Sequence, residues 1–467
     1  MNKKYIPFVS LFFIVFISRI PFLYAGYGIE EDSWGIALAA FHTHLSGVYE
    51  PSRFPGHPVQ ELIYSALWGS GPLVFNGLCA LLSAVAVVFF SLILKHFQFR
   101  HYMLAALAFA FIPVYFISST YTIDFVWTEA FVMIALYLLL KEKLILSGIF
   151  LGLAVGCRIT SGAMLLPFII IIWQQNNLKL NVINFLKLAF PLAVVAVLFF
   201  MPLIIQFGTS FFMYYDQFQY PPITKVLYKM IVGVFGLVGV VAVLAGVVLM
   251  FTKQAKQERG SLFEHTLSKK VIYASVLILI LYSISYFRLP QKSGYMIAVL
   301  PFVLVLFGYY LRSIQFKWLC YALILSPFVC SINLTDKLRG AEYSKYAVVV
   351  TVSGQELFFD PFTGPVFSDL SKRVQKINYT NEVIQKTQSL TSKTVIISGW
   401  WYNEIMVTMI PMSKNNLVVF EPYIDSKKIN EYLAHDYTIL YLPEQNIYND
   451  EMFKMSLTNE AAKPFNL

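Results

Sequence analysis

Long apolar segments recur along most of the chain, and they limit its fold more than any other feature. A transmembrane helix needs about 20 predominantly apolar residues, within a range of about 17 to 25. The chain is 58% hydrophobic and 13% charged, whereas a soluble domain carries about 25% charged residues. We therefore predict an α-helical polytopic membrane protein with about eleven transmembrane helices, near residues 5–25, 73–94, 102–119, 125–140, 144–157, 159–174, 185–205, 226–251, 271–287, 294–311 and 317–333.

The basic residues predict the orientation of this bundle. Alternate connections hold fifteen Lys and Arg residues on one side and seven on the other. Because Lys and Arg favour cytoplasmic loops, the richer side is cytoplasmic and includes the N-terminus. The protein is then expected in a plasma membrane, as in the bacterial inner membrane, with its C-terminal part outside. The seven outward cations are Arg19, Arg53, Arg158, Lys225, Lys229, Arg288 and Lys292.

Net charge and cysteine usage exclude two classes of function. The formal net charge is +9, but the basic residues are spread between apolar segments, so anionic lipid explains them better than a nucleic acid does. The four cysteines lie in apolar segments without a C-x-x-C pair. They predict small core residues rather than a zinc site or a disulfide framework.

The chain becomes polar after Leu334. Short apolar runs such as "AVVVTV", "TVIIS", "LVVF" and "TILYL" predict strands, and the segments between them have helical patterns. Strands that alternate with helices indicate a small α/β domain with a mainly parallel sheet. We therefore expect two domains, a transmembrane domain over 1–333 and an extracytoplasmic α/β domain over 334–467. A phosphate-binding G-x-G-x-x-G motif is absent from the sequence, so nothing in this domain indicates a nucleotide.

The first outward loop opens on three consecutive acids, Glu30, Glu31 and Asp32, and continues to "SRFPGHPVQEL" with Arg53 and His57. A carboxylate at the bilayer edge is partly desolvated, which suits a general base. The alternative is a solvated loop that begins with acids. His42 and His44 also lie in this loop, but two residues apart they diverge on a helix, and we predict no metal site.

Further charged residues follow in later outward turns. Asp124 precedes a predicted span, where it either caps the helix or joins a site, and Glu129 lies about one turn inside that span. Cations on the outer side oppose the positive-inside bias and therefore suggest an anionic ligand such as a lipid-linked phosphate. The alternative is ordinary interfacial anchoring. The candidate cations and their aromatic neighbour are Arg158, Arg288, Lys292 and Tyr295.

The order of these features resembles that of the C-type (GT-C) membrane glycosyltransferase superfamily, which includes protein O-mannosyltransferases and the lipid A aminoarabinose transferase. The matching segments are "EEDSWGIALAA", "RFPGHP", the Asp124 turn, "GLAVGCR" and "KSGYMIAVLP". The resemblance covers roughly residues 1–335. It implies a membrane enzyme that takes a sugar from a polyprenyl-phosphate donor on the outer face and transfers it to a lipid, glycan or protein acceptor.

The resemblance also implies roles for single residues. Glu31 and Asp32 match the acidic pair that supplies the catalytic carboxylate, and the extra acid Glu30 leaves the choice of base open. Asp124 matches the acid of the second outer loop. Arg158 stands where the family commonly has Lys, and Lys292 with Tyr295 matches a basic and an aromatic position.

These residue types suit an inverting glycosyl transfer. One carboxylate removes a proton from the acceptor, and Arg158, Lys292 and Arg288 neutralise the leaving phosphate; this scheme needs no metal or other cofactor. Arg53, His57 and Asp124 are candidates for binding substrate. Two other classes remain open. A transporter or flippase of lipid-linked substrates also needs buried charges, although no inverted repeat is visible. A non-enzymatic assembly factor would use the outer domain to bind a partner.

Overall fold

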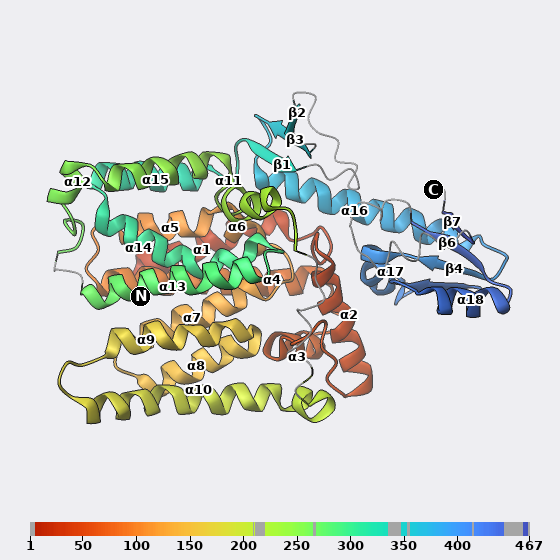
Figure 1. The fold of residues 1–467 in the computed structure, drawn as a ribbon, viewed down its shortest axis with the longest axis horizontal. Coiled ribbons are helices and arrows are strands. Elements are labelled where there is room, and N and C mark those ends of the chain that lie inside the picture. Colours follow the sequence, from red (N-terminus) through yellow and green to blue (C-terminus); the bar gives the residue numbers. More distant parts are fainter. Residues whose placement is uncertain are drawn as a thin grey trace.

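The computed structural model describes residues 5–208, 210, 220–264, 268–334, 347–352, 355–412, 415–442 and 461–465. Most of this part of the chain is helical. Figure 1 shows long helices side by side in a bundle, with α2 (Glu31–Ser46) and α3 (Pro58–Ala66) across one end and α12 (Lys253–Gln257) at the other. The remaining bundle elements are α1 (Ile6–Arg19), η2 (Ile20–Phe22), α4 (Pro72–His96), α5 (Tyr102–Phe111), α6 (Pro113–Ser118), α7 (Phe125–Leu140), α8 (Leu144–Cys157), η3 (Ile159–Met164), α9 (Leu165–Ile172), α10 (Leu178–Phe207), α11 (Ile223–Met250), α13 (Lys269–Arg288), η5 (Ser293–Val299), α14 (Leu300–Tyr310) and α15 (Ser313–Leu325).

Five helical segments of the described chain are long and apolar enough to cross a membrane, judged by length and composition. They are α4, α10, α11, α13 and the continuous segment Ser293–Tyr310. Six shorter apolar segments accompany them, namely Ile6–Phe22, Tyr102–Phe111, Phe125–Leu140, Leu144–Cys157, Ile159–Ile172 and Ser313–Leu325. Each segment overlaps one of the predicted spans, but the shorter ones fall below the usual spanning length.

Two predicted spans were wrong in their extent. The span predicted over 102–119 breaks at Ile112, which has an extended ψ of 128° before Pro113 begins α6. Proline disfavours a helical conformation in the residue before it. The span predicted over 317–333 ends as a helix at Leu325, and β1 (Ser331–Leu334) already pairs with β3 (Gln355–Asp360). Pro327 lies between these two elements.

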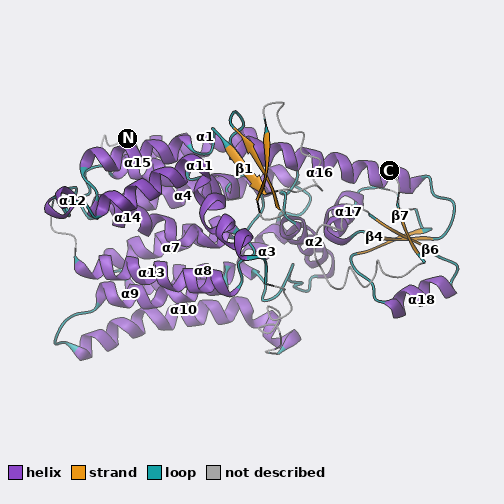
Figure 2. Ribbon diagram, turned by 45° about the horizontal axis from the view of Figure 1, so that its top comes forward, coloured by secondary structure: helices purple, strands orange, loops and turns teal. Residues whose placement is uncertain are grey.

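The small C-terminal α/β region is confirmed. The parallel sheet has the order β5-β4-β6-β7, from β4 (Thr394–Ile397), β5 (Val418–Glu421), β6 (Thr438–Tyr441) and β7 (Ala462–Pro464). Its helices are α16 (Pro365–Gln388), η7 (Gly399–Trp401), α17 (Tyr402–Met409) and α18 (Ser426–Ala434). The "AVVVTV" strand, β2 (Val348–Val352), is not part of this sheet but pairs antiparallel with β3. Figure 2 shows β4, β6 and β7 set apart from the bundle, whereas the strands around β1 lie closer to its helices.

Helix α16 joins the C-terminal region to the bundle through buried cations. Arg373 is fully buried and donates hydrogen bonds to the carbonyl oxygens of Phe22 at 3.1 Å and Thr120 at 3.2 Å. Lys376 donates to the carbonyl oxygen of Ile29 at 3.2 Å and pairs with Glu404 of α17 at 2.9 Å. Ile29 directly precedes the acidic stretch, and Thr120 lies in the turn before Asp124. Helix α16 therefore holds two segments that carry the predicted site acids.

Candidate active site

The acidic stretch lies at the beginning of α2, where the free N–H groups and the helix dipole favour negative charge. Glu30 is the N-cap residue, and Glu31 and Asp32 are in the first turn. The Asp32 carboxylate contacts both Lys292 and Arg53, and Glu30 contacts the same Lys292 ammonium. Glu31 has a different environment, because its carboxylate accepts a hydrogen bond from Asn403 of α17 at 3.4 Å. The three neighbouring acids therefore have two sets of partners.

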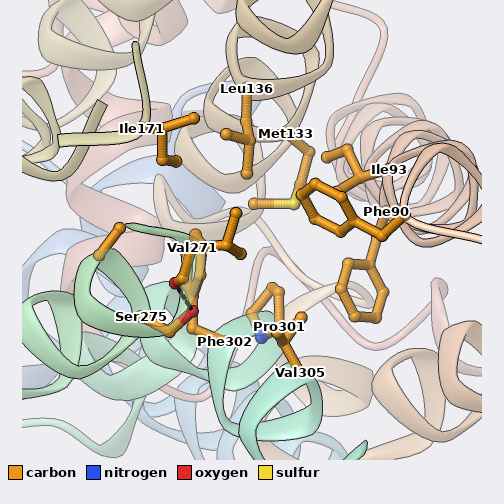
Figure 3. Close-up of a pocket in the computed structure, with 12 residues that line it drawn as sticks. Phe90, Ile93, Met133, Leu136, Ile171, Val271, Ser275, Pro301, Phe302 and Val305 are labelled. Atoms are coloured by element: carbon orange, nitrogen blue, oxygen red, sulfur yellow. Dashed lines mark hydrogen bonds between the residues drawn. The ribbon is translucent and has the colours of Figure 1, made fainter. Parts of the chain in front are cut away.

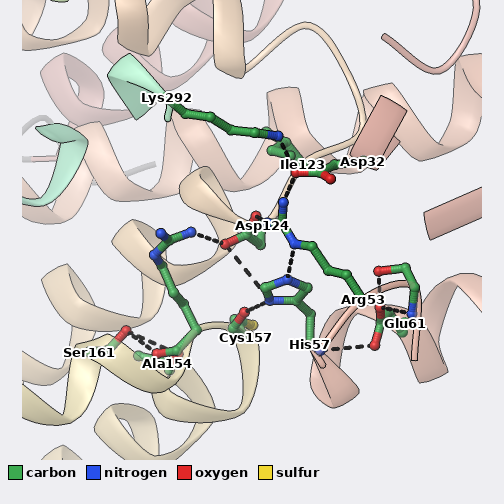
Figure 4. A network of polar contacts seen from close by, with 12 residues as sticks. Asp32, Arg53, His57, Glu61, Ile123, Asp124, Ala154, Cys157, Ser161 and Lys292 are labelled. Carbon is green, nitrogen blue, oxygen red and sulfur yellow. Dashed lines mark hydrogen bonds and ion pairs between the residues drawn. The ribbon is translucent and has the colours of Figure 1, made fainter. Parts of the chain in front are cut away.

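Asp124 anchors a second group of charges beside Asp32. Its side chain is fully buried at the N-cap of α7. One carboxylate oxygen lies 3.3 Å from Nη2 of Arg53, and the other lies 2.7 Å from Nη1 of Arg158. Burial raises the pKa of Asp124, but the charges around it, including both guanidinium groups, lower that pKa by more, so the carboxyl is ionised. Figure 4 shows the Asp124 carboxylate beside Arg53 and His57, with Asp32 between Arg53 and Lys292.

His57 supports Arg53 as a neutral imidazole. Its Nε2 lies 3.1 Å from Nε of Arg53, which can only donate, so Nε2 accepts. Its Nδ1 lies 2.6 Å from the carbonyl oxygen of Cys157, so Nδ1 carries the proton. Burial lowers the pKa of His57, in agreement with this neutral form. The ring therefore fixes the direction of the Arg53 side chain.

Glu61 organises the loop that presents Arg53. Its carboxylate accepts hydrogen bonds from the backbone N–H groups of Ser52 and His57, both at 2.9 Å, and from the Tyr49 hydroxyl. Glu61 is 1% exposed. The side chain therefore acts within the loop. It could not be distinguished from the other acids in the sequence, because two of its partners are backbone N–H groups.

Arg158 and Lys292 come from two different breaks in the helical bundle. Arg158 follows α8 with extended backbone, and its guanidinium lies over the rings of Phe125 at 4.9 Å and Tyr295 at 4.4 Å. Lys292 precedes η5 in an extended conformation. The first-loop carboxylate of Asp32 and the Lys292 ammonium are in direct contact.

Several other predicted residues lie apart from this network. Arg288 is exposed at the end of α13 and makes none of the ion pairs found among the described residues of the network. His42 is 3.1 Å from Glu50, and His44 contacts the carbonyl oxygen of Ser65 at 3.2 Å, so the loop histidines diverge. Arg19 was counted among the outward cations, yet it is fully buried and donates to Ser119 at 2.9 Å. Its guanidinium N–H groups donate to protein acceptors inside the bundle, so Arg19 has a structural role there.

A separate pocket lies near the opposite end of the bundle and contains no charged group. The empty space within it, which is in part open to solvent, is about 340 Å³, and its lining comes from Phe97 and from α4, α7, α9, α13 and α14. Figure 3 shows the apolar side chains of Phe90, Met133 and Phe302 around it. The Ser275 hydroxyl donates a hydrogen bond to the carbonyl oxygen of Val271 in the same helix. A pocket without acids or bases offers no chemistry, so the candidate active site is the charged network.

Sequence reasoning missed the contribution of the C-terminal region. Asn403, Arg373 and Lys376 lie more than 340 positions from the residues that they contact in the first 30 or so positions. No local sequence pattern indicates such long-range contacts, although a buried cation needs a partner in the fold.

No known family model matches the chain, and no curated protein matches it either.

Proposed function

We propose that the protein is an integral membrane glycosyltransferase that moves a sugar from a polyprenyl-phosphate donor to an acceptor on the outer face. The observation that carries the proposal is the network itself. Carboxylates and Arg53 of the first loop, Asp124, and the cations Arg158 and Lys292 of two later segments meet at one end of a helical bundle, where a lipid-linked phosphate would arrive from the bilayer. Donor chemistry needs both charges together, since the acceptor must lose a proton and the phosphate must be neutralised.

The surface of the bundle supports a membrane location. Helix α10 exposes Phe190 (70%), Leu198 (63%) and Ile205 (76%), and α11 exposes Val248 (68%). Water-exposed apolar surface of this extent is unusual in a soluble monomer, whereas lipid covers it at no cost. In this proposal all eleven apolar segments lie in the bilayer, the shorter ones packed inside the bundle, with the network on the outer side of a bacterial inner membrane.

The acceptor loses its proton to Asp32. The acceptor oxygen or nitrogen attacks the anomeric carbon, and the bond from that carbon to the phosphate oxygen breaks. The electron pair leaves with the polyprenyl phosphate, while the proton stays on the Asp32 carboxyl. Direct displacement inverts the anomeric centre, in keeping with one acting carboxylate rather than a nucleophilic pair.

Lys292 and Arg158 hold the leaving phosphate. Lys292 contacts Asp32 and Glu30 in this structure, so a donor phosphate competes with these carboxylates for the ammonium. Donor binding thereby loosens Asp32 from one of its two cations and makes it a better base. Asp124 keeps Arg158 and Arg53 in place during this exchange, as a positioning residue.

The test uses purified protein in nanodiscs and polyprenyl phosphates that carry different radiolabelled sugars, with a membrane extract as the source of acceptor. Release of free polyprenyl phosphate together with transfer of the label supports the enzyme. Movement of intact donor across the bilayer without cleavage would indicate the transporter. Binding without either process, across the whole donor panel, would contradict the glycosyltransferase proposal.

A further inference from the structure

A narrow second pocket lies next to Arg158. It is lined by Phe125, Thr128 and Glu129 of α7, by Arg158 and Ser161, by Tyr282 of α13, and by Gly294, Tyr295, Ile297 and Ala298. The empty space within it, which is in part open to solvent, is about 260 Å³. Arg158 therefore belongs to both places, because it binds Asp124 at 2.7 Å and also lines this pocket. Whatever occupies the pocket lies beside the proposed phosphate site.

Glu129 is the unusual residue of this pocket. It is 1% exposed, and neither carboxylate oxygen has a hydrogen-bond partner among the described residues. The neighbouring Thr128 hydroxyl is also buried without a partner there. Leaving a buried polar group unsatisfied costs about 1–3 kcal/mol, and more for a charged one. Asp124 and Glu61, by contrast, use both of their oxygens on protein donors.

A purely structural role does not account for this arrangement. A buried acid that stabilises a fold does so through its partners, and an apolar residue of similar size would pack here at lower cost. Ionisable groups within helical membrane segments most often face a cavity and mark a path or a ligand. The unsatisfied groups of Glu129 and Thr128 converge on the same cavity, which indicates a ligand with several hydrogen-bond donors.

We propose that this pocket receives the sugar ring of the lipid-linked donor, with Glu129 and Thr128 as hydrogen-bond partners of the ring hydroxyls. This inference rests on the proposed function. In the donor, the sugar is bonded directly to the phosphate. A phosphate bound at Arg158 would therefore place the sugar ring next to Arg158. Phe125, Tyr282 and Tyr295 contribute aromatic carbon to the lining of the pocket, which suits the C–H groups of a sugar. A polyprenyl tail fits the pocket poorly because it would leave Glu129 unsatisfied.

If a sugar ring occupies this pocket, variants of Glu129 should lose sugar binding without losing stability. Glu129→Leu removes the hydrogen-bonding group and also removes an unsatisfied buried carboxyl. The variant should therefore melt at the wild-type temperature or above it, while it loses recognition of the sugar. Glu129→Gln keeps the size and one acceptor, so it should retain part of that recognition. Glu142→Gln, at an exposed residue two positions after the end of α7, is the matched control.

The experiment compares two probes by titration in nanodiscs. One is bare polyprenyl phosphate, and the other is the polyprenyl-phosphate sugar that the wild-type protein consumes. Glu129→Leu should weaken binding of the sugar-bearing donor by about ten- to a hundredfold and leave the bare lipid phosphate unchanged. Glu129→Gln should fall between Glu129→Leu and wild type, and Glu142→Gln should match wild type.

Several results would overturn the inference. An equal loss for both probes would place Glu129 in the phosphate site or the fold, and no loss for either would remove it from substrate binding. A Glu129→Leu protein that melts well below wild type would indicate a structural carboxyl. If the wild-type protein binds neither probe and consumes no donor of the panel, the proposed function itself fails, which is a distinct outcome.

Discussion

Replacing Asp32 by Asn should change turnover and phosphate binding in opposite directions. The variant keeps the size of the side chain but removes the base, and loss of general-base catalysis costs about 10²–10⁴-fold in rate. It also removes a carboxylate that competes with the donor phosphate for Lys292. The side chains of Asp32 and Lys292 are 21% and 17% exposed, so solvent screens part of their attraction. We therefore take the low end of the range for hydrogen bonds to charged groups, about 1.5 kcal/mol, or about a tenfold gain in affinity.

The assay measures the two quantities separately. Titration with bare polyprenyl phosphate gives affinity, and release of polyprenyl phosphate from the sugar-bearing donor gives turnover. Glu50→Gln is the control, because Glu50 lies in the same outer loop but pairs with His42, and its side chain is 56% exposed. Near-wild-type turnover in Asp32→Asn would refute its role as the base. Weaker rather than tighter binding of the bare lipid phosphate would refute the competition between Asp32 and phosphate.

Three further predictions concern the groups around this base. Lys292→Met should weaken donor binding about ten- to a hundredfold, and Lys292→Arg should restore part of it; equal donor titrations for all three proteins would leave Lys292 as an interfacial anchor. Asp124 has a lowered pKa in the fold, so its stabilisation is present above the unfolded pKa of about 3.9 and is lost as pH falls below it. The melting temperature of wild type should therefore exceed that of Asp124→Asn by less at pH 3 than at pH 5, and a constant gap would contradict this pairing. Lys376→Met combined with Glu404→Gln removes both charges of a buried pair. This double variant should lower turnover about ten- to a hundredfold with little change in the melting temperature. The exposed pair Lys386 and Glu382, altered in the same way, is the control, and unchanged turnover in the Lys376 and Glu404 variant would remove α16 from the site.

The sequence predicted the helices and the parallel sheet because both depend on local patterns. Apolar runs in the first part and short β-branched runs such as "TVIIS" in the second each reflect the environment of their own segment. The errors lie at prolines and at long-range pairings. Pro113 breaks a continuous apolar run. Strand β1 forms only because it pairs with β3, which lies about 25 residues later in the sequence. A local pattern carries no information about such a partner.

The candidate site shows the same division. Asp32, Asp124, Arg158 and Lys292 were predictable as a group, because each is a charge next to an apolar segment and the predicted topology places all four on the same side. Their individual pairings were not predictable. Asp32 and Glu31 are neighbours in sequence, yet one contacts cations of the bundle and the other contacts Asn403, since successive residues of a helix point about 100° apart.

The contacts of α16 explain why the charged network keeps one arrangement. A cluster of two arginines, a lysine and three acids has many alternative pairings of similar energy, and flexible loops would sample them. Lys376 fixes the carbonyl group before Glu30, and Arg373 fixes the turn before Asp124. Both cations are buried, so their hydrogen bonds have no competition from water. Each acid then meets its own cation in a defined geometry, and a base held in this way can be released by a phosphate without collapse of the rest of the network.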